Sequence, residues 1–343
     1  MIEAVYLENY KCYGPNGAKF DLKPLTFLYG TNGVGKSTFI EAVLQLKEWE
    51  QKRIKPGKLW LSADFVFKKN ETLPVGIGVA LSTNSGNIKL FKRVCFKDGE
   101  GIIESDKIDP VMNDSQREGA LADFMKMRHM SASRPESKIA KSNQTSSLAD
   151  LQQPDEARMD GVKAVNNSDE INRMLAQVGF SDYEFINREE LRDKLYDVTI
   201  PWKNTGAGVH NNAFTLDAIA SLQPNGILLL EEPETHMDPR YLGAFARVLV
   251  DAIHVKTGAQ IIVECHSEHL MLAIKGLIRT KAMKADEVTA LHVGRSPEGS
   301  VVTHIPLAED GTFDREWPDG GFYLERRELI MMGEDKMFGV SES

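Results

Sequence analysis

The chain has 343 residues, of which 42% are hydrophobic and 27% charged, so it can bury a full core and has an ordinary globular composition. Its formal net charge of −9 argues against binding nucleic acid by bulk electrostatics, although a local basic patch is compatible with it. Three scattered cysteines indicate neither a disulfide framework nor a zinc site. We find no signal-peptide pattern and no apolar run near the ~20 residues that cross a bilayer, so we expect a cytoplasmic protein without a membrane partner.

The first predicted elements are short strands that lead into a glycine-rich loop. Residues 1–29 contain two or three apolar runs, separated by a Gly-Pro-Asn-Gly turn. The last run, 25–29, is typical of a buried strand, and residues 39–46 are typical of a helix. Between them, residues 30–38 fit the pattern G-x-x-x-x-G-K-[ST] at every fixed position, which predicts a phosphate-binding loop rather than a chance turn.

The loop predicts how a nucleotide would be held. Its glycines let the backbone aim N–H groups at phosphate oxygens, and the following helix adds the positive end of its dipole. Lys36 would reach the β- and γ-phosphates, and Ser37 would bind Mg²⁺. The residues predicted to bind ATP here are Gly30, Asn32, Gly33, Gly35, Lys36, Ser37 and Thr38.

The middle of the chain is less regular than its ends. Strand-like runs at 59–67, 75–81 and 88–96 predict an antiparallel meander. Beyond it, the polar stretch 137–168 predicts a surface excursion with partial helix or disorder. The other predicted elements of this part are a helix over 115–129, a helix over 169–178 capped by Ser168, and strands over 183–186 and 194–200.

From residue 204 onward, strands and helices alternate, which implies parallel strands with right-handed crossovers. A glycine turn at 206–209 precedes them. The predicted strands are 227–232, 260–264, 288–293 and 300–305, and the predicted helices are 212–222, 239–254, 267–279 and 323–332. The whole pattern predicts an α/β fold of the P-loop NTPase type, with a mostly parallel central sheet, an antiparallel β-meander lobe and a helical or irregular insertion.

Two acids follow the apolar strand 227–230. A buried strand cannot keep unpaired carboxylates inside, so Glu231 and Glu232 must emerge at its C-terminal end, where ligands bind in open parallel sheets. Glu231 is then placed to hold Mg²⁺, directly or through water, and Glu232 to polarise the attacking water. An acidic strand end followed by a turn is the alternative interpretation of this pair alone.

A second apolar strand, 261–263, also ends in polar residues. His266, just beyond it, could donate to the γ-phosphate or position the water. A capping histidine is one alternative, and a metal site formed by His266 with His269 is another, although two imidazoles without a clear third ligand make the metal site a weak hypothesis.

Together, these motifs resemble the ABC-type ATPase heads of the chromosome-condensation and recombination-repair class, which includes SMC and RecF heads. Within that class, the chain is similar to the OLD-like (overcoming-lysogenization-defect-like) ATPases. Residues 7–13 resemble the first strand of the class, 230–239 its Walker B motif and D-loop, and 264–270 its histidine switch. Residues 305–322 resemble the C-terminal segment of one OLD-like subgroup. The resemblance covers residues 1–50 and 200–330 well and the part between poorly.

The resemblance implies an Mg²⁺-dependent ATPase in which two heads form a homodimer around two nucleotides. Residues 206–212 stand where the signature loop that completes the partner's site is expected, so Gly208 and His210 would contact ATP there. His210 occupies the position of a serine that commonly meets the γ-phosphate, so it or an asparagine replaces the serine, or activation across the dimer is weak. A simple β-turn is the alternative. The glutamine-bearing loop has no clear equivalent, and Ser133-Arg134 is only a guess.

The resemblance also frames the organisation and role of the chain. We expect one ATPase head over 1–343, made of an N-terminal lobe (1–96), a variable insertion (97–200) and a C-terminal lobe (201–343). About sixty residues follow the histidine-switch helix, too few for the nuclease domain of OLD proteins, and no long coiled-coil arms are predicted. The expected output is therefore the switching of a separate effector, such as a nuclease or toxin in bacterial antiphage defence. The alternatives are an ATP-binding scaffold with negligible hydrolysis and a DNA-repair head.

Overall fold

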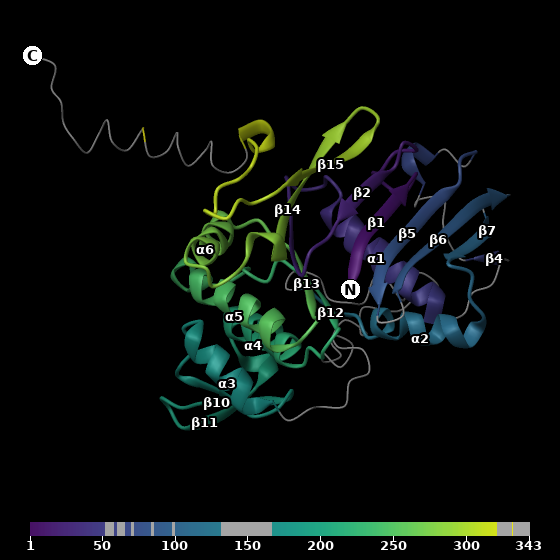
Figure 1. Cartoon of the computed structure of the whole chain (residues 1–343). Helices are drawn as coiled ribbons and strands as arrows, with labels where there is room; N and C mark the ends of the chain where they lie inside the picture. The colour runs from purple at the N-terminus through teal and green to yellow at the C-terminus, as the bar shows by residue number, and fades with distance from the viewer. Residues whose placement is uncertain are drawn as a thin grey trace, which may run out of the picture.

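The structure is a computed structural model that describes residues 1–51, 58–59, 66–69, 72–83, 86–97, 100–131, 167–320 and 331. Two six-stranded sheets form its framework, and a small three-stranded sheet lies with the helices on the far side of one of them (Figure 1). One sheet is mostly parallel and contains the strand that leads into the glycine-rich loop, as the sequence predicts.

The central sheet has the order β15-β14-β3-β13-β12-β8. All of its neighbouring strands are parallel except β14 and β15, which form an antiparallel hairpin. Its strands are β3 (Leu25–Tyr29), β8 (Arg128–Ser131), β12 (Ile227–Glu231), β13 (Gln260–Glu264), β14 (Val288–Ser296) and β15 (Gly299–Ile305).

Both faces of this sheet are buried, which explains why its strands are continuous apolar runs. Side chains alternate between the faces along each strand. In β12, Ile227 and Leu229 pack into one apolar core, whereas Leu228 and Leu230 pack into a second core on the opposite face. The same alternation in β13 sends Ile262 to the first core.

The first core lies between the central sheet and an antiparallel sheet of order β2-β1-β5-β6-β7-β4. Helix α1 (Lys36–Gln51) contributes its apolar side chains to this core, and α2 (Asp114–Met125) packs beside it. The strands of this second sheet are β1 (Ile2–Glu8), β2 (Ala18–Asp21), β4 (Lys58–Leu59), β5 (Val75–Thr83), β6 (Gly86–Lys97) and β7 (Glu100–Asp109).

The second core covers the opposite face of the central sheet with helices (Figure 1). Among them, α4 is buried all round over its last ten residues, as expected of a helix enclosed by other elements. A small sheet of order β11-β10-β9 packs against α3. The elements here are α3 (Ser168–Gln177), β9 (Tyr183–Phe185), β10 (Glu190–Asp193), β11 (Val198–Pro201), α4 (Ala207–Ala220), α5 (Leu242–Val255) and α6 (Glu268–Arg279).

The structure corrects several predicted elements in the middle of the chain. The helix predicted over 115–129 ends at Met125, because β8 follows and joins the central sheet beside β12. The strand predicted over 194–200 is a hairpin, since residues 194–197 connect β10 to β11. Strand β7, within the segment predicted to be irregular, was not predicted because its sequence carries four acids among ten residues.

Helix boundaries also differ from the predicted ones. Asn167, not Ser168, is the N-cap of α3, and it makes no side-chain capping hydrogen bond. Helix α4 begins at Ala207, so the predicted glycine turn is the first turn of that helix. A short 3-10 turn over Pro239–Tyr241 precedes α5. The glutamine-loop guess at 133–134, most of the polar stretch 137–168 and all of the helix predicted over 323–332 except residue 331 lie outside the described residues.

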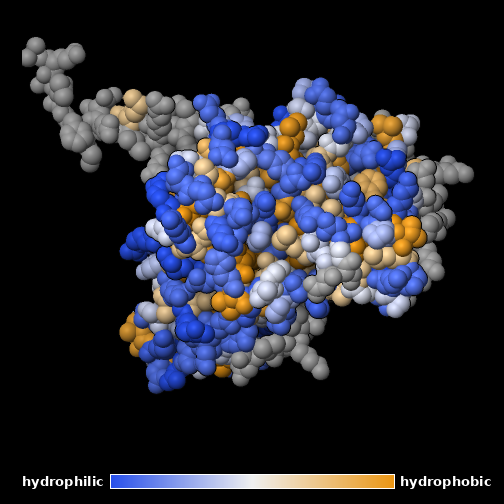
Figure 2. Space-filling view, in the orientation of Figure 1, coloured by the Kyte–Doolittle hydropathy of each residue, from blue (hydrophilic) through white to orange (hydrophobic). Residues whose placement is uncertain are grey.

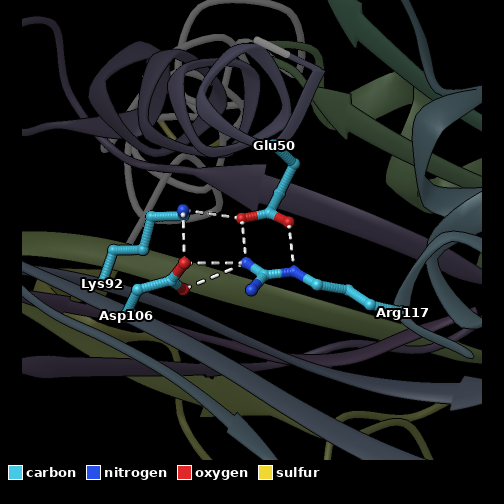
Figure 3. Close-up of polar contacts among 4 residues, drawn as sticks. All are labelled: Glu50, Lys92, Asp106 and Arg117. Carbon is cyan, nitrogen blue, oxygen red and sulfur yellow. Dashed lines mark hydrogen bonds and ion pairs between the residues drawn. The ribbon is translucent and has the colours of Figure 1, made fainter. Parts of the chain in front are cut away.

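A buried network of four charged side chains ties α1 to the antiparallel sheet and to α2 (Figure 3). The Lys92 ammonium of β6 lies 2.8 Å from Glu50 Oε1 and 3.3 Å from Asp106 Oδ2. From α2, the Arg117 guanidinium donates to both oxygens of Glu50 and to Asp106. Lys92 is 1% exposed and Glu50 8%, so the two positive and two negative charges neutralise one another away from water.

No helix among the described residues combines the length and apolar character needed to cross a membrane. On the face drawn in Figure 2, hydrophilic residues predominate and hydrophobic ones occur in small scattered groups. Scattered apolar residues of this kind are normal for a protein surface, so that face offers no broad apolar docking area.

Candidate nucleotide-binding site

The glycine-rich loop connects β3 to α1, as predicted, and its glycines adopt conformations that side chains disfavour. Gly30, Gly33 and Gly35 have φ values of 144°, 76° and 115°. A Cβ atom on Gly30 would lie 2.2 Å from the carbonyl oxygen of Val293, and one on Gly35 would lie 2.5 Å from Cys12 Sγ. Only glycine lets the loop pass this close to its neighbours.

Two buried hydroxyl groups hold the loop from beneath. Tyr13 Oη donates to the Gly35 carbonyl at 2.7 Å, and Ser300 Oγ donates to the Val34 carbonyl at 2.6 Å. The loop tip at Thr31, Asn32 and Gly33 stays exposed. The loop is therefore fixed at its base and open where a phosphate would approach.

Lys36 is 3% exposed and folds back over the loop. Its ammonium donates to the carbonyls of Gly30 and Thr31, each at 3.0 Å, and lies 3.9 Å from Glu264 Oε1. Burial lowers the pKa of Lys36, and the nearby Glu264 carboxylate opposes that shift. The ammonium thus already lies inside the loop that would surround the phosphates.

Glu264 is the residue nearest to the predicted metal-binding hydroxyl. Ser37 Oγ donates to Glu264 Oε1 at 2.9 Å. Because Glu264 has the same parity along β13 as Ile262, its side chain faces α1, and β13 is the direct neighbour of the loop strand β3. Burial, followed by the nearby charge of Glu231, raises the pKa of Glu264 to about 7.

Glu231 ends the next strand and is held by a histidine that sequence analysis did not single out. Its carboxylate accepts a contact of 2.6 Å from His129 Nε2, on β8, and the residue is 6% exposed. Glu231 is paired in register with Glu264 and faces the same side of the sheet. Glu231, the predicted magnesium ligand, therefore lies one strand further from the loop than Glu264 does.

Glu232 and His266 meet across the ends of β12 and β13. His266 Nε2 lies 3.5 Å from Glu232 Oε1, and both side chains are about one-third exposed. Glu232 adopts a left-handed φ of 48°, a conformation that costs energy for a residue with a side chain and that recurs at functional sites. Burial, followed by the positive charge of Lys36, lowers the pKa of His266, which favours the neutral form of its ring.

An open cavity of about 480 Å³ lies in front of these groups. Its volume is within the range of small-molecule sites. Glu234 belongs to its wall and accepts a hydrogen bond from the His266 backbone N–H at 2.6 Å, and burial raises the pKa of Glu234. The lining residues are Asn32, Glu232, Glu234, Thr235, His266 and Ser267.

The structure thus brings together some predicted residues and separates others. Asn32, Lys36, Ser37, Glu232 and His266 converge at one edge of the central sheet, and Thr38 follows in the first turn of α1. The tertiary structure added Glu264, His129 and Glu234 to the site. The signal for Glu264 was an acid at the end of an apolar strand.

Gly208 and His210 lie in the first turn of α4 and do not line this cavity. A Cβ atom on Gly208 would lie 3.1 Å from the His236 carbonyl, so the turn packs against the loop that follows β12. The His210 ring packs on Phe214 and Trp202, with centroid distances of 4.7 and 6.0 Å. Within one chain, these two residues are not part of the pocket that Glu232 and His266 line.

A glycine loop between a parallel strand and a helix, together with acids at the ends of the neighbouring strands, defines the architecture of a P-loop NTPase. The chain belongs to the AAA domain family, whose model matches residues 4–216. Among curated proteins, no sequence matched the chain.

Solved structures support the same fold. The SMC head domain from Thermotoga maritima is 16% identical, covers 89% of this chain and 99% of its own length, and gives a TM-score of 0.54. An SMC head bound to the C-terminal winged-helix domain of ScpA is 15% identical, covers 90% of this chain and 98% of its own length, and gives a TM-score of 0.59. An SMC head from Pyrococcus furiosus, bound to the C-terminal domain of ScpA, is 13% identical. It covers 98% of this chain and 99% of its own length, and gives a TM-score of 0.56. At these identities the likeness shows the fold.

The raised pKa of Glu264 predicts a pH-dependent stability. A carboxyl group with a pKa of about 7 in the folded protein and an ordinary value near 4.5 when unfolded binds its proton better in the folded state. Ionisation of this carboxyl group therefore destabilises the folded protein increasingly as the pH rises from about 4.5 to 7. We expect Glu264→Gln to stabilise the nucleotide-free protein at pH 8 by at most about 3 kcal/mol, and to make no difference near pH 4.5. Urea unfolding with a chelator present measures this, and equal stability at pH 8 would contradict it.

Proposed function

We propose that this protein is an Mg²⁺-dependent ATPase whose heads form a homodimer around ATP and switch a separate effector protein. The observation that carries the proposal is the convergence of Lys36, Ser37, Glu232 and His266 at one open edge of the sheet. Each side chain has the chemistry that phosphoryl transfer to water requires at that place.

The donor groups around Ser37 fit a magnesium ion. Mg²⁺ prefers oxygen ligands and keeps several of its waters, and Ser37 supplies a hydroxyl group while Glu231 and Glu264 supply carboxylates within the same corner. Ser37 and Glu231 would hold the ion, Glu231 directly or through water. When bound, the ion would neutralise charge on the phosphate oxygens.

The chain's own residues would divide the remaining work. Lys36 would release the two loop carbonyls and donate to the β- and γ-phosphates. Glu232 would accept a proton from the attacking water, and neutral His266, 3.5 Å away, would donate to the γ-phosphate. The exposed tip at Asn32 and the loop amides would surround the phosphates.

The proposals of a dimer and of a separate effector rest on the resemblance to OLD-like ATPases. Gly208 and His210 lie away from the pocket of their own chain, which fits a role in a partner's site. The effector would be a nuclease or toxin of an antiphage system of the OLD-like kind. Two SMC heads of similar fold are bound to parts of ScpA, so binding a separate protein is compatible with this fold.

A scaffold that binds ATP with negligible hydrolysis is the second candidate. Packing of the His210 ring on Phe214 and Trp202 favours it, because a ring held among aromatic side chains is less available to a γ-phosphate across a dimer. Phosphate release by the purified protein, measured with and without DNA and a neighbouring gene product, separates the candidates. DNA stimulation that falls steeply with salt would instead favour a repair head.

The nucleotide-binding step is tested by Lys36→Met, which keeps the buried stem and removes the charge. Loss of a charge-assisted contact to phosphate is expected to weaken ATP binding about tenfold or more. A fluorescent ATP analogue measures the affinity. Lys47→Met is the matched control, because Lys47 lies on the same helix and donates to the Met127 carbonyl. Equal affinities of both variants and the wild type would remove Lys36 from the site.

A further inference from the structure

Three metal-ligating side chains lie together in front of the glycine-rich loop. One ligand atom each from Glu232, Glu264 and His266 can be chosen so that all three lie within 4.8 Å of one another. In the part of the chain that the structure describes, this is the one group of three histidine, cysteine or acidic side chains with that geometry. The three residues come from two adjacent strand ends, so the sheet itself sets their spacing.

The contacts of the Glu264 carboxylate independently indicate that a ligand binds at this place. The residue is 4% exposed, and its Oε1 accepts from Ser37. Its other oxygen, Oε2, is fully buried and has no hydrogen-bond partner among the described residues. A buried carboxylate oxygen without a partner is costly unless a cation or a donor binds it.

Lys36 does not provide that missing partner. Its ammonium is 3.9 Å from Oε1, on the side of the loop, and is already donating to two loop carbonyls. Glu232 and His266 are each about one-third exposed and border the cavity, so an ion bound by the three residues would keep open positions for water.

We propose that Glu232, Glu264 and His266 form a binding site for a divalent cation of the Mn²⁺ and Zn²⁺ class, and that this site fills without nucleotide. Two carboxylates and one imidazole suit such ions, whereas Mg²⁺ strongly prefers oxygen ligands. The ion would neutralise the two crowded carboxylates in the nucleotide-free protein, and it would leave Glu232 and His266 before these act on the attacking water and the γ-phosphate. The site shares residues with the proposed ATPase, but its occupancy does not depend on hydrolysis.

The test uses the whole protein, stripped of metal with a chelator and titrated with Mn²⁺ in the absence of nucleotide. Electron paramagnetic resonance counts the bound ions, and its pulsed form detects a coupled ¹⁴N nucleus from a histidine ligand. We expect one bound Mn²⁺ with ¹⁴N coupling that survives an excess of Mg²⁺. Glu264→Gln should weaken Mn²⁺ binding at least about tenfold, and His266→Gln should abolish the coupling.

Two variants serve as controls. His269→Gln removes the exposed histidine three residues further along and should keep both the affinity and the ¹⁴N coupling. Asp238→Asn removes a partly exposed carboxylate on the loop after β12 and should change the affinity by no more than about twofold. His266 is itself about one-third exposed, so His266→Gln is expected to keep the fold and to give a readout of the site that is independent of Glu264→Gln.

The proposal is overturned if Mn²⁺ binds only after nucleotide is added, if the ¹⁴N coupling persists in His266→Gln, or if Glu264→Gln binds Mn²⁺ as the wild type does. These outcomes leave the proposed ATPase untouched, because ATP binding is measured separately through Lys36→Met. Conversely, loss of the ATP-binding role of Lys36 would not remove a metal site that forms without nucleotide.

Discussion

The Glu232→Gln protein is expected to bind ATP with the affinity of the wild type and to hydrolyse it at least about 100-fold more slowly. Glutamine keeps the size of the side chain and its contact distance to His266, but it cannot accept the proton of the attacking water. Because hydrolysis would no longer convert the ATP-bound dimer to other states, ATP-bound dimers should accumulate. Phosphate release gives the rate, and light scattering after size-exclusion chromatography gives the mass.

Glu309→Gln is the control for this experiment, because Glu309 is exposed and does not line the cavity. This variant should hydrolyse ATP at the wild-type rate, and its monomeric fraction should equal that of the wild type. Unchanged turnover in Glu232→Gln would exclude Glu232 as the general base. Lost ATP affinity in that variant would place the residue in nucleotide binding instead of in the chemical step.

The Glu50→Ala protein is expected to lose about 3–5 kcal/mol of its free energy of unfolding. The substitution leaves the buried ammonium of Lys92 and the guanidinium of Arg117 facing the single carboxylate of Asp106 (Figure 3). It also detaches the end of α1 from β6 and α2, whereas the start of α1 carries the phosphate loop. Urea unfolding followed by circular dichroism measures the loss.

Two further variants test whether the loss comes from an uncompensated buried charge. Lys126→Ala, in an exposed ion pair at the end of α2, should change stability by less than about 1 kcal/mol. The double variant Glu50→Leu with Lys92→Met removes one charge of each sign and should recover most of the loss. A double variant as unstable as Glu50→Ala would show that packing, and not charge balance, is the cause.

The phosphate loop could be predicted from the sequence because its chemistry is local. Positive φ at Gly30, Gly33 and Gly35, the buried strand before them and the helix after them are properties of consecutive residues. The alternation of strands and helices after residue 204 likewise predicted a parallel sheet, and the strand pairing confirms it. The fold class follows from such short-range patterns.

The middle of the chain was harder to predict because its elements depend on partners that are distant in sequence. Residues 128–131 look like the end of a helix, but they pair with β12, about one hundred residues later. The acidic strand β7 is stabilised by pairing with β6 and, at Asp106, by Lys92 and Arg117. Tertiary contacts of this kind override local propensity.

The sequence by itself determined that this protein has a phosphate-binding loop and that acids and a histidine end two apolar strands. Only the tertiary structure decided which of these groups lie near the loop. Strand β13 lies between β3 and β12, so Glu264 contacts Ser37, while Glu231 is one strand further away and contacts His129. The physical reason is that strand order is set by how the sheet buries both of its faces, and no local pattern encodes the order in which distant strands become neighbours.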